Sequence, residues 1–499
     1  MSLEHELNFY FGFKSFRPGQ ADVINHLLKT TEDAICTFPC AFGKSIIYCI
    51  PALFSREAVL VISPLCSLIQ DQVQKLNLVT KTAFNLSASC DSELSDETVV
   101  FSEEFMIKSG PVFLFCTPEK VASSYFLQKL KRFHDRRPFQ YFVLDEAHLL
   151  SEQGFSFRPD FLKLGVLRDE FPTVRFFCFS ATCNAFSQEI LRSVLKLKNT
   201  EVFSVSDDRK NMNINIHYCS KTSKRCTCGS QTCTWRHSPS KIHPSFISKI
   251  STYSAGEVLI LTNSRKDVEK IQQEVQSALP RKVVEAYHGN MEDEERSRIQ
   301  SRFLCKHTDI IVATIASFGV GVDMPLLRHI CLFGIPLNIY SFIQTIGRGG
   351  RNGQEYVCDV FVKESDILKQ NAVLKSEIST ISSSKRKYIE FLRSSHDMMV
   401  SVIKGPISKK ICIANYIKAI LTAPRQVLNV EFKHLERFKK INNRLCSSDK
   451  ARWSSVDRTW YLPPLAYHKS LEAYGAQSPL QVGRCEKCSV CIQTCAGAK

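Results

Sequence analysis

The sequence has no apolar run of the roughly 18 residues that a membrane-spanning helix requires, so no membrane span is expected. The first residues, MSLEHELNFY, lack a basic segment followed by an apolar one, so no secretory signal is expected. Glycine and proline number only 20 and 19, which excludes a collagen-like chain. No internal repeat of solenoid length occurs. These absences predict an intracellular globular protein without a membrane partner, in the nucleus if its source is eukaryotic and in the cytoplasm otherwise.

Acidic residues are too few to balance the basic ones. Aspartate and glutamate total 49 against 65 lysines and arginines, which gives a net charge of +16 and a pI near 9.0. This surplus favours a polyanionic partner such as nucleic acid, without identifying one by itself. Hydrophobic residues form 44% and charged residues 23% of the chain, as in a globular protein with a sizeable core. A length of 499 residues corresponds to about three domains.

The chain contains 21 cysteines. In a long chain without a secretory signal, reduced thiols and metal sites are the better interpretation than disulfides. Four of these cysteines lie inside apolar runs and are expected to be core residues: Cys36, Cys116, Cys178 and Cys331.

Short apolar runs alternate with longer amphipathic stretches up to about residue 365. The runs, rich in β-branched or aromatic residues, are typical of buried parallel strands; they lie at 34–38, 58–63, 112–116, 141–145 and 175–180, and again at 257–262, 283–288, 309–314 and 329–334. Helical stretches such as 21–29 and 67–76 lie between them. This alternation predicts α/β, doubly wound parallel sheets, with ligands bound at the polar clusters that follow the strands.

Segment 204–256 interrupts this rhythm, so two sheets fit the sequence better than one. We expect a first domain at 1–205 and a second at 206–365, with a basic, cysteine-rich insertion at 217–245. Residues 366–499 are expected to form a basic helical region that ends in a cysteine cluster.

The segment FPCAFGKS, residues 38–45, directly follows a predicted strand. A GK[ST] triplet at such a turn is the centre of a phosphate-binding loop, in which Lys44 would reach the β- and γ-phosphates of ATP and Ser45 would hold Mg²⁺. Backbone N–H groups of Cys40, Ala41, Phe42 and Gly43 would cradle the phosphates, and Pro39, which has no N–H, is a further candidate nucleotide contact. Phe38 occupies the place of the usual first glycine, and by itself the segment could also be a chance GKS turn.

The segment DEAH, residues 145–148, ends a predicted strand. Asp145 is placed to organise Mg²⁺, and Glu146 is placed to position or deprotonate the attacking water. The alternative is a solvated acidic strand end, which the preceding phosphate loop makes the weaker interpretation.

The segment QTIGRGGR, residues 344–351, places two arginines three positions apart. Arg348 and Arg351 could reach the γ-phosphate as arginine fingers, and Gln344 is a candidate nucleotide contact. A surface Arg–Gly loop is the alternative.

Together these segments resemble those of the superfamily 2 helicases and, within them, the RecQ family of DNA helicases. The resemblance covers about 1–365 and rests on motifs in family order: FGFKSFRPGQ (11–20), VISPLCSLIQDQV (61–73), FCTPEKV (115–121), SAT (180–182), LTNSRKDVEKI (261–271), AYHGNM (286–291), ATIASFGVGVDMP (313–325) and IGRGGRNG (346–353). It implies two RecA-like helicase domains, with Arg17 and Gln20 as nucleotide contacts. It also implies an ATP- and Mg²⁺-dependent 3′–5′ DNA helicase, of the isomerase class, acting on single-stranded and duplex or branched DNA in recombination, repair or replication.

The phosphate loop departs from the family pattern. The family commonly has TGGGKS where this chain has CAFGKS. If position 41 requires a left-handed backbone, Ala41 costs about 1–2 kcal/mol. Phe42 would either block close approach of the backbone to phosphate or point outward. We therefore expect ATP binding to survive and leave the turnover rate open.

The segment SEQGFSFRPDF, residues 151–161, resembles the family's aromatic-rich loop, which senses single-stranded DNA and signals to the ATP site. Base stacking on aromatic rings supplies the physical basis. The candidates are Phe155, Phe157 and Arg158. Gln153 stands where the family usually has tryptophan, which predicts weaker coupling.

Four cysteines near the C-terminus, Cys485, Cys488, Cys491 and Cys495, have the spacing C-x₂-C-x₂-C-x₃-C. Zn²⁺ is the default metal for such thiolates, and an iron–sulfur cluster is the weaker alternative. The RecQ zinc module looks similar, but its upstream cysteine is absent and His468 lies there instead. The ligands are therefore three cysteines plus His468, or all four cysteines.

The insertion carries a second cysteine group, Cys226, Cys228, Cys233 and His237. It could be a small zinc knuckle that touches nucleic acid. A disordered basic loop with stray cysteines is an equal alternative.

Basic residues also dominate 385–458, followed by Trp460 and Tyr461. This composition suits a strand- or duplex-binding platform, or a solvated helix face. The winged-helix domain of longer RecQ proteins is not evident. Two other functions stay open: a nucleotide- and DNA-binding protein with little or no helicase activity, and an RNA helicase.

Overall fold

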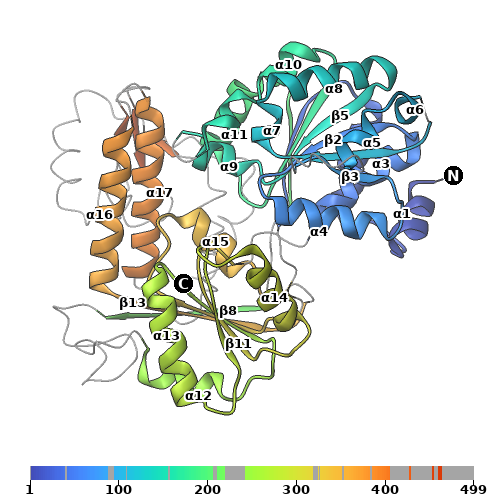
Figure 1. Cartoon of the computed structure of the whole chain (residues 1–499). Coiled ribbons are helices and arrows are strands. Elements are labelled where there is room, and N and C mark those ends of the chain that lie inside the picture. The colour runs from blue at the N-terminus through green and yellow to red at the C-terminus, as the bar shows by residue number, and fades with distance from the viewer. Residues whose placement is uncertain are drawn as a thin grey trace, which may run out of the picture.

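The computed structural model describes residues 2–39, 42–87, 95–107, 109–155, 158–205, 211–219, 242–318, 324, 326–350, 353–381 and 385–404, with three short strands at 426–428, 452–454 and 459–462. Two sheet domains and a pair of long helices make up most of this part of the chain (Figure 1).

The first domain is built on a seven-stranded parallel sheet with the order β3-β4-β2-β5-β6-β1-β7. Its strands are β1 (Ala34–Thr37), β2 (Ala58–Ile62), β3 (Ala83–Asn85), β4 (Val112–Cys116), β5 (Phe139–Leu144), β6 (Arg175–Ser180) and β7 (Glu201–Ser204). Two of the central strands, β2 and β4, are buried along their whole length, and β5 is buried at every residue but one, as a sheet covered on both faces requires. Two separate hydrophobic clusters fill the two faces.

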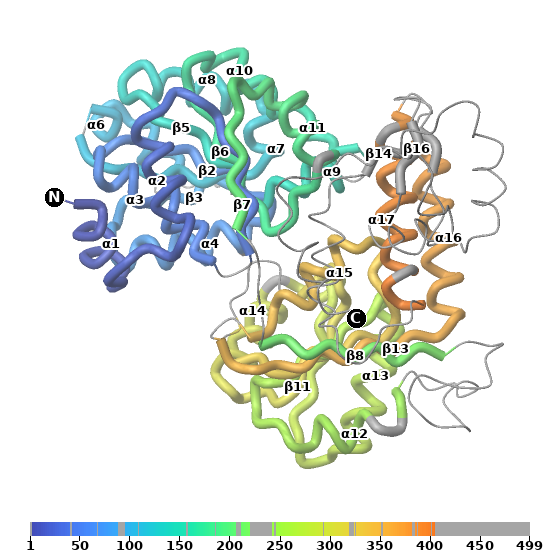
Figure 2. Tube along the Cα trace, turned by 180° about the vertical axis from the view of Figure 1, so that it is seen from behind, coloured from blue at the N-terminus to red at the C-terminus, as the bar shows by residue number. Residues whose placement is uncertain are grey.

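Helices cover both faces of this sheet (Figures 1 and 2). They are α1 (Leu3–Phe11), α2 (Gln20–Lys29), α3 (Lys44–Ser55), α4 (Cys66–Asn77), α5 (Asp96–Val100), α6 (Glu103–Met106), α7 (Pro118–Val121), α8 (Ser124–Arg136), α9 (His148–Gln153), α10 (Val166–Glu170) and α11 (Ala185–Val194), with a 3₁₀ turn at Pro159–Lys163. The amphipathic segments at 21–29 and 67–76 thus form α2 and α4, as the sequence predicts.

The second domain has a six-stranded parallel sheet with the order β10-β11-β9-β12-β13-β8. Its strands are β8 (Met212–Cys219), β9 (Val258–Thr262), β10 (Val284–Tyr287), β11 (Ile310–Thr314), β12 (His329–Phe333) and β13 (Tyr356–Lys363). Its helices are α12 (Pro244–Ile250), α13 (Arg265–Ala278), α14 (Asp293–Leu304) and α15 (Ile339–Ile346). The prediction of two parallel-sheet domains is confirmed.

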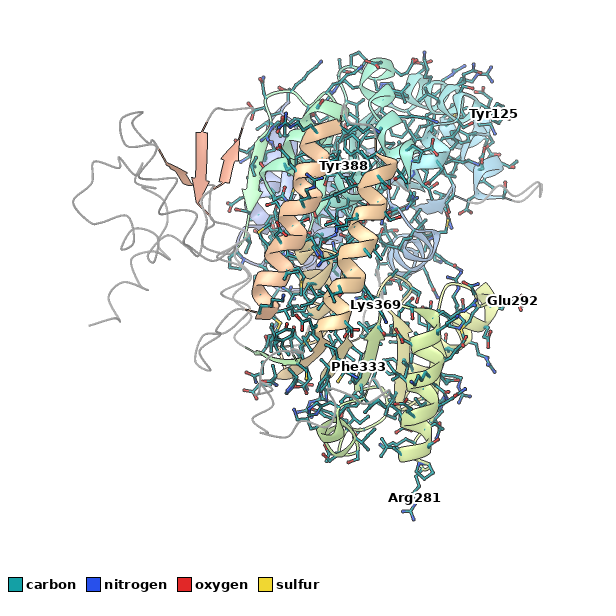
Figure 3. The ribbon with its side chains drawn as sticks, turned by 90° about the vertical axis from the view of Figure 1, so that its left-hand side faces the viewer. Tyr125, Arg281, Glu292, Phe333, Lys369 and Tyr388 are labelled. Carbon is teal, nitrogen blue, oxygen red and sulfur yellow. The ribbon has the colours of Figure 1, made fainter. Side chains whose placement is uncertain are left out.

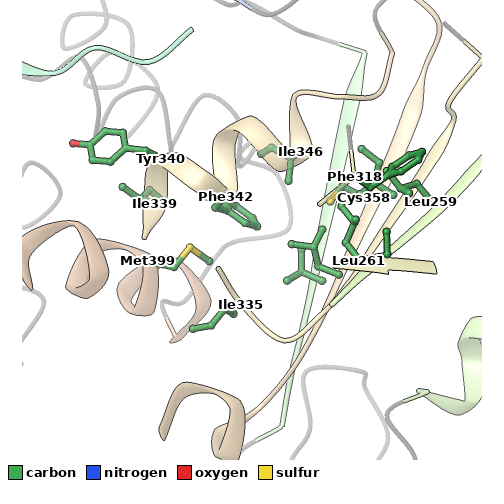
Figure 4. Packing of buried hydrophobic residues seen from close by; sticks show 14 of the residues in the cluster. Leu259, Leu261, Phe318, Ile335, Ile339, Tyr340, Phe342, Ile346, Cys358 and Met399 are labelled. Atoms are coloured by element: carbon green, nitrogen blue, oxygen red, sulfur yellow. The ribbon is translucent and has the colours of Figure 1, made fainter. Parts of the chain in front are cut away.

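Two long antiparallel helices, α16 (Glu364–Thr380) and α17 (Arg386–Lys404), follow the second sheet. Met399 of α17 is fully buried and lies beside Ile339 and Phe342 of α15 (Figure 4). Tyr388, near the start of α17, lies at the end of the helix that is closer to the first domain (Figure 3). The helix pair therefore shares the core of the second domain and extends toward the first.

The basic helical region expected at 366–499 contains the helices α16 and α17 and, beyond them, strands as well. Beyond α17 the structure describes a three-stranded antiparallel sheet of β14 (Gln426–Leu428), β15 (Arg452–Ser454) and β16 (Thr459–Leu462). Valine and aromatic residues in these segments favour strands over helices.

The strands that the sequence analysis missed are those without a clean apolar run. β7 is an edge strand whose residues are mostly exposed, so no hydrophobic pattern marks it. β13 carries a charged residue, Asp359, in its fully buried centre. β8 continues to Cys219 and α12 begins at Pro244, so both ends of the range expected for the insertion, 217–245, lie in regular structure.

Asp359 tolerates this burial because its partners neutralise it. Burial alone would raise its pKa, but hydrogen bonds from His217 and His329, 3.0 and 2.9 Å away, and the charge of Lys249 hold the pKa well below the usual range.

Among the helices in the described part of the chain, none combines the length and the hydropathy needed to cross a membrane.

Candidate functional site

The phosphate loop joins β1 to α3 and ends at Gly43, whose left-handed backbone conformation favours glycine. Gly43 has a φ of 87° and caps α3, which begins at Lys44. A Cβ at Gly43 would lie 2.9 Å from Nε2 of Gln20, and that amide donates a 2.8 Å hydrogen bond to the carbonyl of Phe42. The helix start leaves backbone N–H groups available for an anion, which suits a phosphate. Cys40 and Ala41 lie outside the described residues.

The side chain of Phe42 packs against the domain. Its ring stacks on that of Phe38 with 4.9 Å between centroids and 8° between planes. The guanidinium of Arg17 lies over the Phe42 ring, 6.0 Å from its centroid. The substituted loop position thus contacts the segment that contains Arg17 and Gln20.

The acidic pair after β5 faces the loop lysine. Nζ of Lys44 lies 3.5 Å from Oε1 of Glu146, and both side chains are less than one-fifth exposed. Glu146 has a φ of 48°, a left-handed conformation that is costly for a residue with a side chain and is concentrated at functional sites. Burial, with the charge of Glu146 adding to it, raises the pKa of Asp145 above its usual range. Gln72 of α4 donates to Oδ2 of Asp145 at 2.9 Å and fixes the carboxylate.

Buried His148 connects this pair to two other motifs. Burial and the charge of Lys44 lower its pKa to about 3, so the imidazole is neutral at physiological pH. The amide of Gln344, in the second domain, donates to Nε2, which leaves Nδ1 as the protonated nitrogen. Nδ1–H then donates to Oγ of Ser180 at 3.0 Å, in the SAT segment. One imidazole therefore links the DEAH segment, the SAT segment and the second domain.

The donor set of the site fits Mg²⁺. Ser45 lies exposed in the first turn of α3, and Asp145 directly follows the end of β5. Carboxylate and hydroxyl oxygens are the hard ligands that Mg²⁺ prefers. Pro39 accepts a 3.2 Å hydrogen bond from the N–H of Phe42, which closes the turn of the loop.

The structure holds the side chain of Arg348 inside the second domain. Its guanidinium is buried within the second domain and donates to the carbonyls of Phe318 and Ile315. To reach a γ-phosphate the side chain would have to leave these partners, so its role as an arginine finger stays a prediction. Arg351 lies outside the described residues.

Arg158 of the aromatic-rich loop forms a fixed contact within the first domain. Its Nε and Nη2 donate to the two oxygens of Glu119 at 2.8 Å each, and Nη1 donates to the carbonyl of Pro64 at 2.6 Å. Pro64 and Glu119 belong to the two segments that resemble the family's DNA-gripping motifs. Arg158 therefore ties the loop to both.

Phe155 of the same loop packs against α17. Its ring lies 4.8 Å from that of Tyr388, and Nζ of Lys385 lies 5.2 Å from the Phe155 centroid. The Tyr388 hydroxyl donates to the carbonyl of Glu152 at 2.9 Å. Phe157 lies outside the described residues.

A second aromatic contact lies beside the first. Phe186 of α11 stacks on Phe391 of α17 at 4.5 Å, and Phe391 in turn stacks on Tyr340 of α15 at 5.6 Å. α17 therefore bridges the aromatic-rich loop of the first domain and α15 of the second.

Neither predicted metal site can be located in this structure. All of their ligands lie outside the described residues: Cys226, Cys228, Cys233 and His237 of the insertion, and His468, Cys485, Cys488, Cys491 and Cys495 of the tail. The residues that the structure does describe contain no group of three histidine, cysteine or acidic side chains arranged to hold a metal.

Gln72, Glu119 and Tyr388 are the site residues that sequence reasoning missed. Gln72 and Glu119 lie inside segments already identified by resemblance, so their polar side chains were the available signal. Tyr388 had no such signal, because an aromatic residue in an amphipathic helix is usually part of the core.

The fold and this constellation of side chains define a superfamily 2 helicase. Residues 17–190 match the family model described as DEAD/DEAH box helicase, and residues 243–353 match that of the helicase conserved C-terminal domain. Among solved structures, the DEAD-box helicase Mss116 bound to ssRNA and UDP-BeF is similar with a TM-score of 0.57 at 17% identity, covering 84% of this chain and 88% of that one. At this identity the likeness concerns the fold alone.

Proteins of similar sequence identify the family within this superfamily. The chain is 31% identical to the probable ATP-dependent DNA helicase RecS of Bacillus subtilis, over 76% of this chain and 70% of that protein. It is 33% identical to the ATP-dependent DNA helicase RecQ of Haemophilus influenzae, over 72% of this chain and 53% of that one. The chain belongs to the RecQ family. It spans about a third of the Arabidopsis thaliana ATP-dependent DNA helicase Q-like 4B, covering 30% of its length at 33% identity.

Proposed function

We propose that this protein is an ATP-dependent DNA helicase that moves 3′ to 5′ and unwinds duplex or branched DNA. The observation that carries the proposal is the continuous set of contacts from Lys44 through Glu146 and His148 to Gln344. This set connects the phosphate loop of one domain to the arginine-bearing segment of the other. Such a connection is what converts nucleotide hydrolysis into domain movement.

The residues of the site would divide the chemistry as follows. Lys44 would neutralise charge on the β- and γ-phosphates, and Ser45 and Asp145 would hold Mg²⁺. On nucleotide binding, Lys44 would exchange Glu146 for phosphate, which frees the Glu146 carboxylate to orient the attacking water. Neutral His148 would hold Gln344 without adding positive charge beside Lys44.

The aromatic-rich loop supports nucleic acid as the activator. Phe155 offers a ring on which a base could stack, while Arg158 links the loop to both segments expected to grip one strand. The RecQ relatives support DNA over RNA as the substrate, and the polarity rests on the family resemblance alone.

The test combines two assays. ATP turnover is measured with single-stranded DNA, with single-stranded RNA and without nucleic acid, and strand separation is measured on duplexes with a 3′ or a 5′ single-stranded tail. We expect stimulation by DNA and unwinding of the 3′-tailed duplex. Stimulation by RNA alone would favour the RNA helicase. ATP binding without turnover would favour the nucleotide- and DNA-binding protein, and Glu146→Gln is the inactive control.

We further propose that the C-terminal cysteine cluster binds one Zn²⁺ through Cys485, Cys488 and Cys491, with His468 or Cys495 as the fourth ligand. Thiolates at this spacing suit tetrahedral zinc. The support is sequence spacing and family resemblance.

A further inference from the structure

We propose that Phe42 is a positioning residue for Arg17, so that the altered phosphate loop of this chain takes part in recognising the base of the nucleotide. The inference rests on the proposed function, because Arg17 is assigned to the nucleotide there. It concerns one of the loop positions at which this chain departs from the family pattern.

The first support is a stack of three side chains. Phe38 is 1% exposed and forms the base of the stack at the end of β1. The half-buried ring of Phe42 lies parallel to it, and the exposed guanidinium of Arg17 lies over the Phe42 ring. A guanidinium over an aromatic face is attracted by the ring quadrupole, so the ring restricts where an otherwise exposed arginine points.

The second support is a pair of hydrogen bonds through which the Gln20 side chain connects the backbone of Arg17 to the backbone of Phe42. The N–H of Arg17 donates to Oε1 of Gln20 at 2.9 Å, and Nε2 of Gln20 donates to the carbonyl of Phe42 at 2.8 Å. A Cβ at Gly19 would meet Val205 at 2.7 Å and lie 3.8 Å from the ring of Phe38, so this turn is pressed against the same stack. Ring and backbone contacts thus join the loop to Arg17 at two independent points.

The chemistry of Phe42 decides which part of the nucleotide it affects. A phenyl ring has no donor for a phosphate oxygen, and the phosphate contacts of the loop come from backbone N–H groups and Lys44. Arg17 has a flat cationic group suited to stacking on a purine. Phe42 therefore acts on the base through Arg17, with no part in phosphoryl transfer.

The experiment compares two ligands on the full chain. Binding of ATP and of inorganic tripolyphosphate, which has no base, is measured with Mg²⁺ by competition against a fluorescent ATP analogue. Phe42→Leu and Phe42→Met both remove the ring and keep an apolar side chain, whereas Phe42→Tyr keeps the ring. We expect the leucine and methionine variants to bind ATP about two- to five-fold more weakly, the range for an exposed cation–π contact. Tripolyphosphate binding should not change, and the tyrosine variant should behave like the wild type.

A double-mutant cycle completes the test. In an Arg17→Ala background, Phe42→Leu should have no further effect on ATP affinity. Equal weakening of ATP and tripolyphosphate, an unchanged ATP affinity, or an additive cycle would each overturn the proposal. A wild-type protein that does not bind the fluorescent analogue would instead refute the proposed function, so the two failures are distinguishable.

Discussion

Replacing Tyr388 with leucine should tighten the binding of single-stranded DNA. If Phe155 stacks on a base, it must first leave Tyr388, whose ring lies 4.8 Å away. DNA and α17 then compete for the same aromatic face. Binding of DNA must overcome the free energy of the Phe155–Tyr388 contact. A variant in which this contact is weaker should therefore bind DNA more tightly.

The contact itself sets the magnitude. An aromatic pair contributes about 0.5–1.5 kcal/mol beyond the area it buries, which corresponds to about a two- to ten-fold increase in affinity. The gain should be smaller if Lys385, 5.2 Å from the Phe155 centroid, continues to hold the ring. Since Tyr388 is only 2% exposed, Tyr388→Leu should also lower the melting temperature.

The assay is fluorescence anisotropy of a labelled oligo(dT) at low salt and without nucleotide, which makes it independent of hydrolysis. Tyr388→Phe is the matched control, because it removes the hydrogen bond to the carbonyl of Glu152 and keeps the ring. In a Phe155→Leu background, Tyr388→Leu should add nothing. Unchanged or weaker DNA binding by a folded Tyr388→Leu protein would refute the reasoning, and a merely damaged protein would not bind more tightly.

The remaining predictions concern hydrolysis, pH and metal. Glu146→Gln should bind ATP but lose DNA-stimulated turnover, measured by phosphate release, because it lacks the carboxylate that orients water. Arg351→Ala should keep nearly normal ATP affinity and slow hydrolysis by orders of magnitude in single-turnover kinetics, whereas a loss of affinity alone would contradict a finger role. Burial, with the charge of Glu146 adding to it, raises the pKa of Glu152 from 4.5 to about 8. Its stabilising contribution should therefore be complete below about pH 4.5 and be lost as the pH rises through 8, and Glu152→Gln should flatten this decline in melting temperature. Purified protein should contain about one zinc by elemental analysis, and Cys488→Ser should lose it.

The buried strands could be predicted because each is a short apolar run, and a parallel strand covered on both faces has no polar side to disguise it. β13 was missed for a specific reason. Asp359 is charged and fully buried, and it is tolerated only because His217 of β8 and His329 of β12 meet it in the folded sheet. Those partners are distant in sequence, so no local pattern reveals the strand.

The nucleotide site, like the fold, could be predicted from the sequence only in part. Local motifs identify Lys44, Asp145 and Glu146, since each lies in a segment that follows a buried strand, at the edge of the sheet where such folds bind ligands. The motifs do not show that His148 donates to Ser180 and accepts from Gln344, because that arrangement depends on how the two domains meet. They also do not show where the side chain of Phe42 points, because its orientation depends on the ring of Phe38, on which it packs.

The contact between α17 and the aromatic-rich loop has a consequence for the basic tail. Lys385 begins the basic stretch that suits either a DNA-binding platform or a solvated helix face, and the structure places its ammonium over Phe155. Single-stranded DNA binds proteins through its bases, which stack on aromatic rings, and through its phosphates, which pair with cations. In this structure the Lys385 ammonium and the Phe155 ring contact each other. A DNA strand entering this site would therefore exchange the Lys385–Phe155 contact for one contact between Phe155 and a base and one between Lys385 and a phosphate.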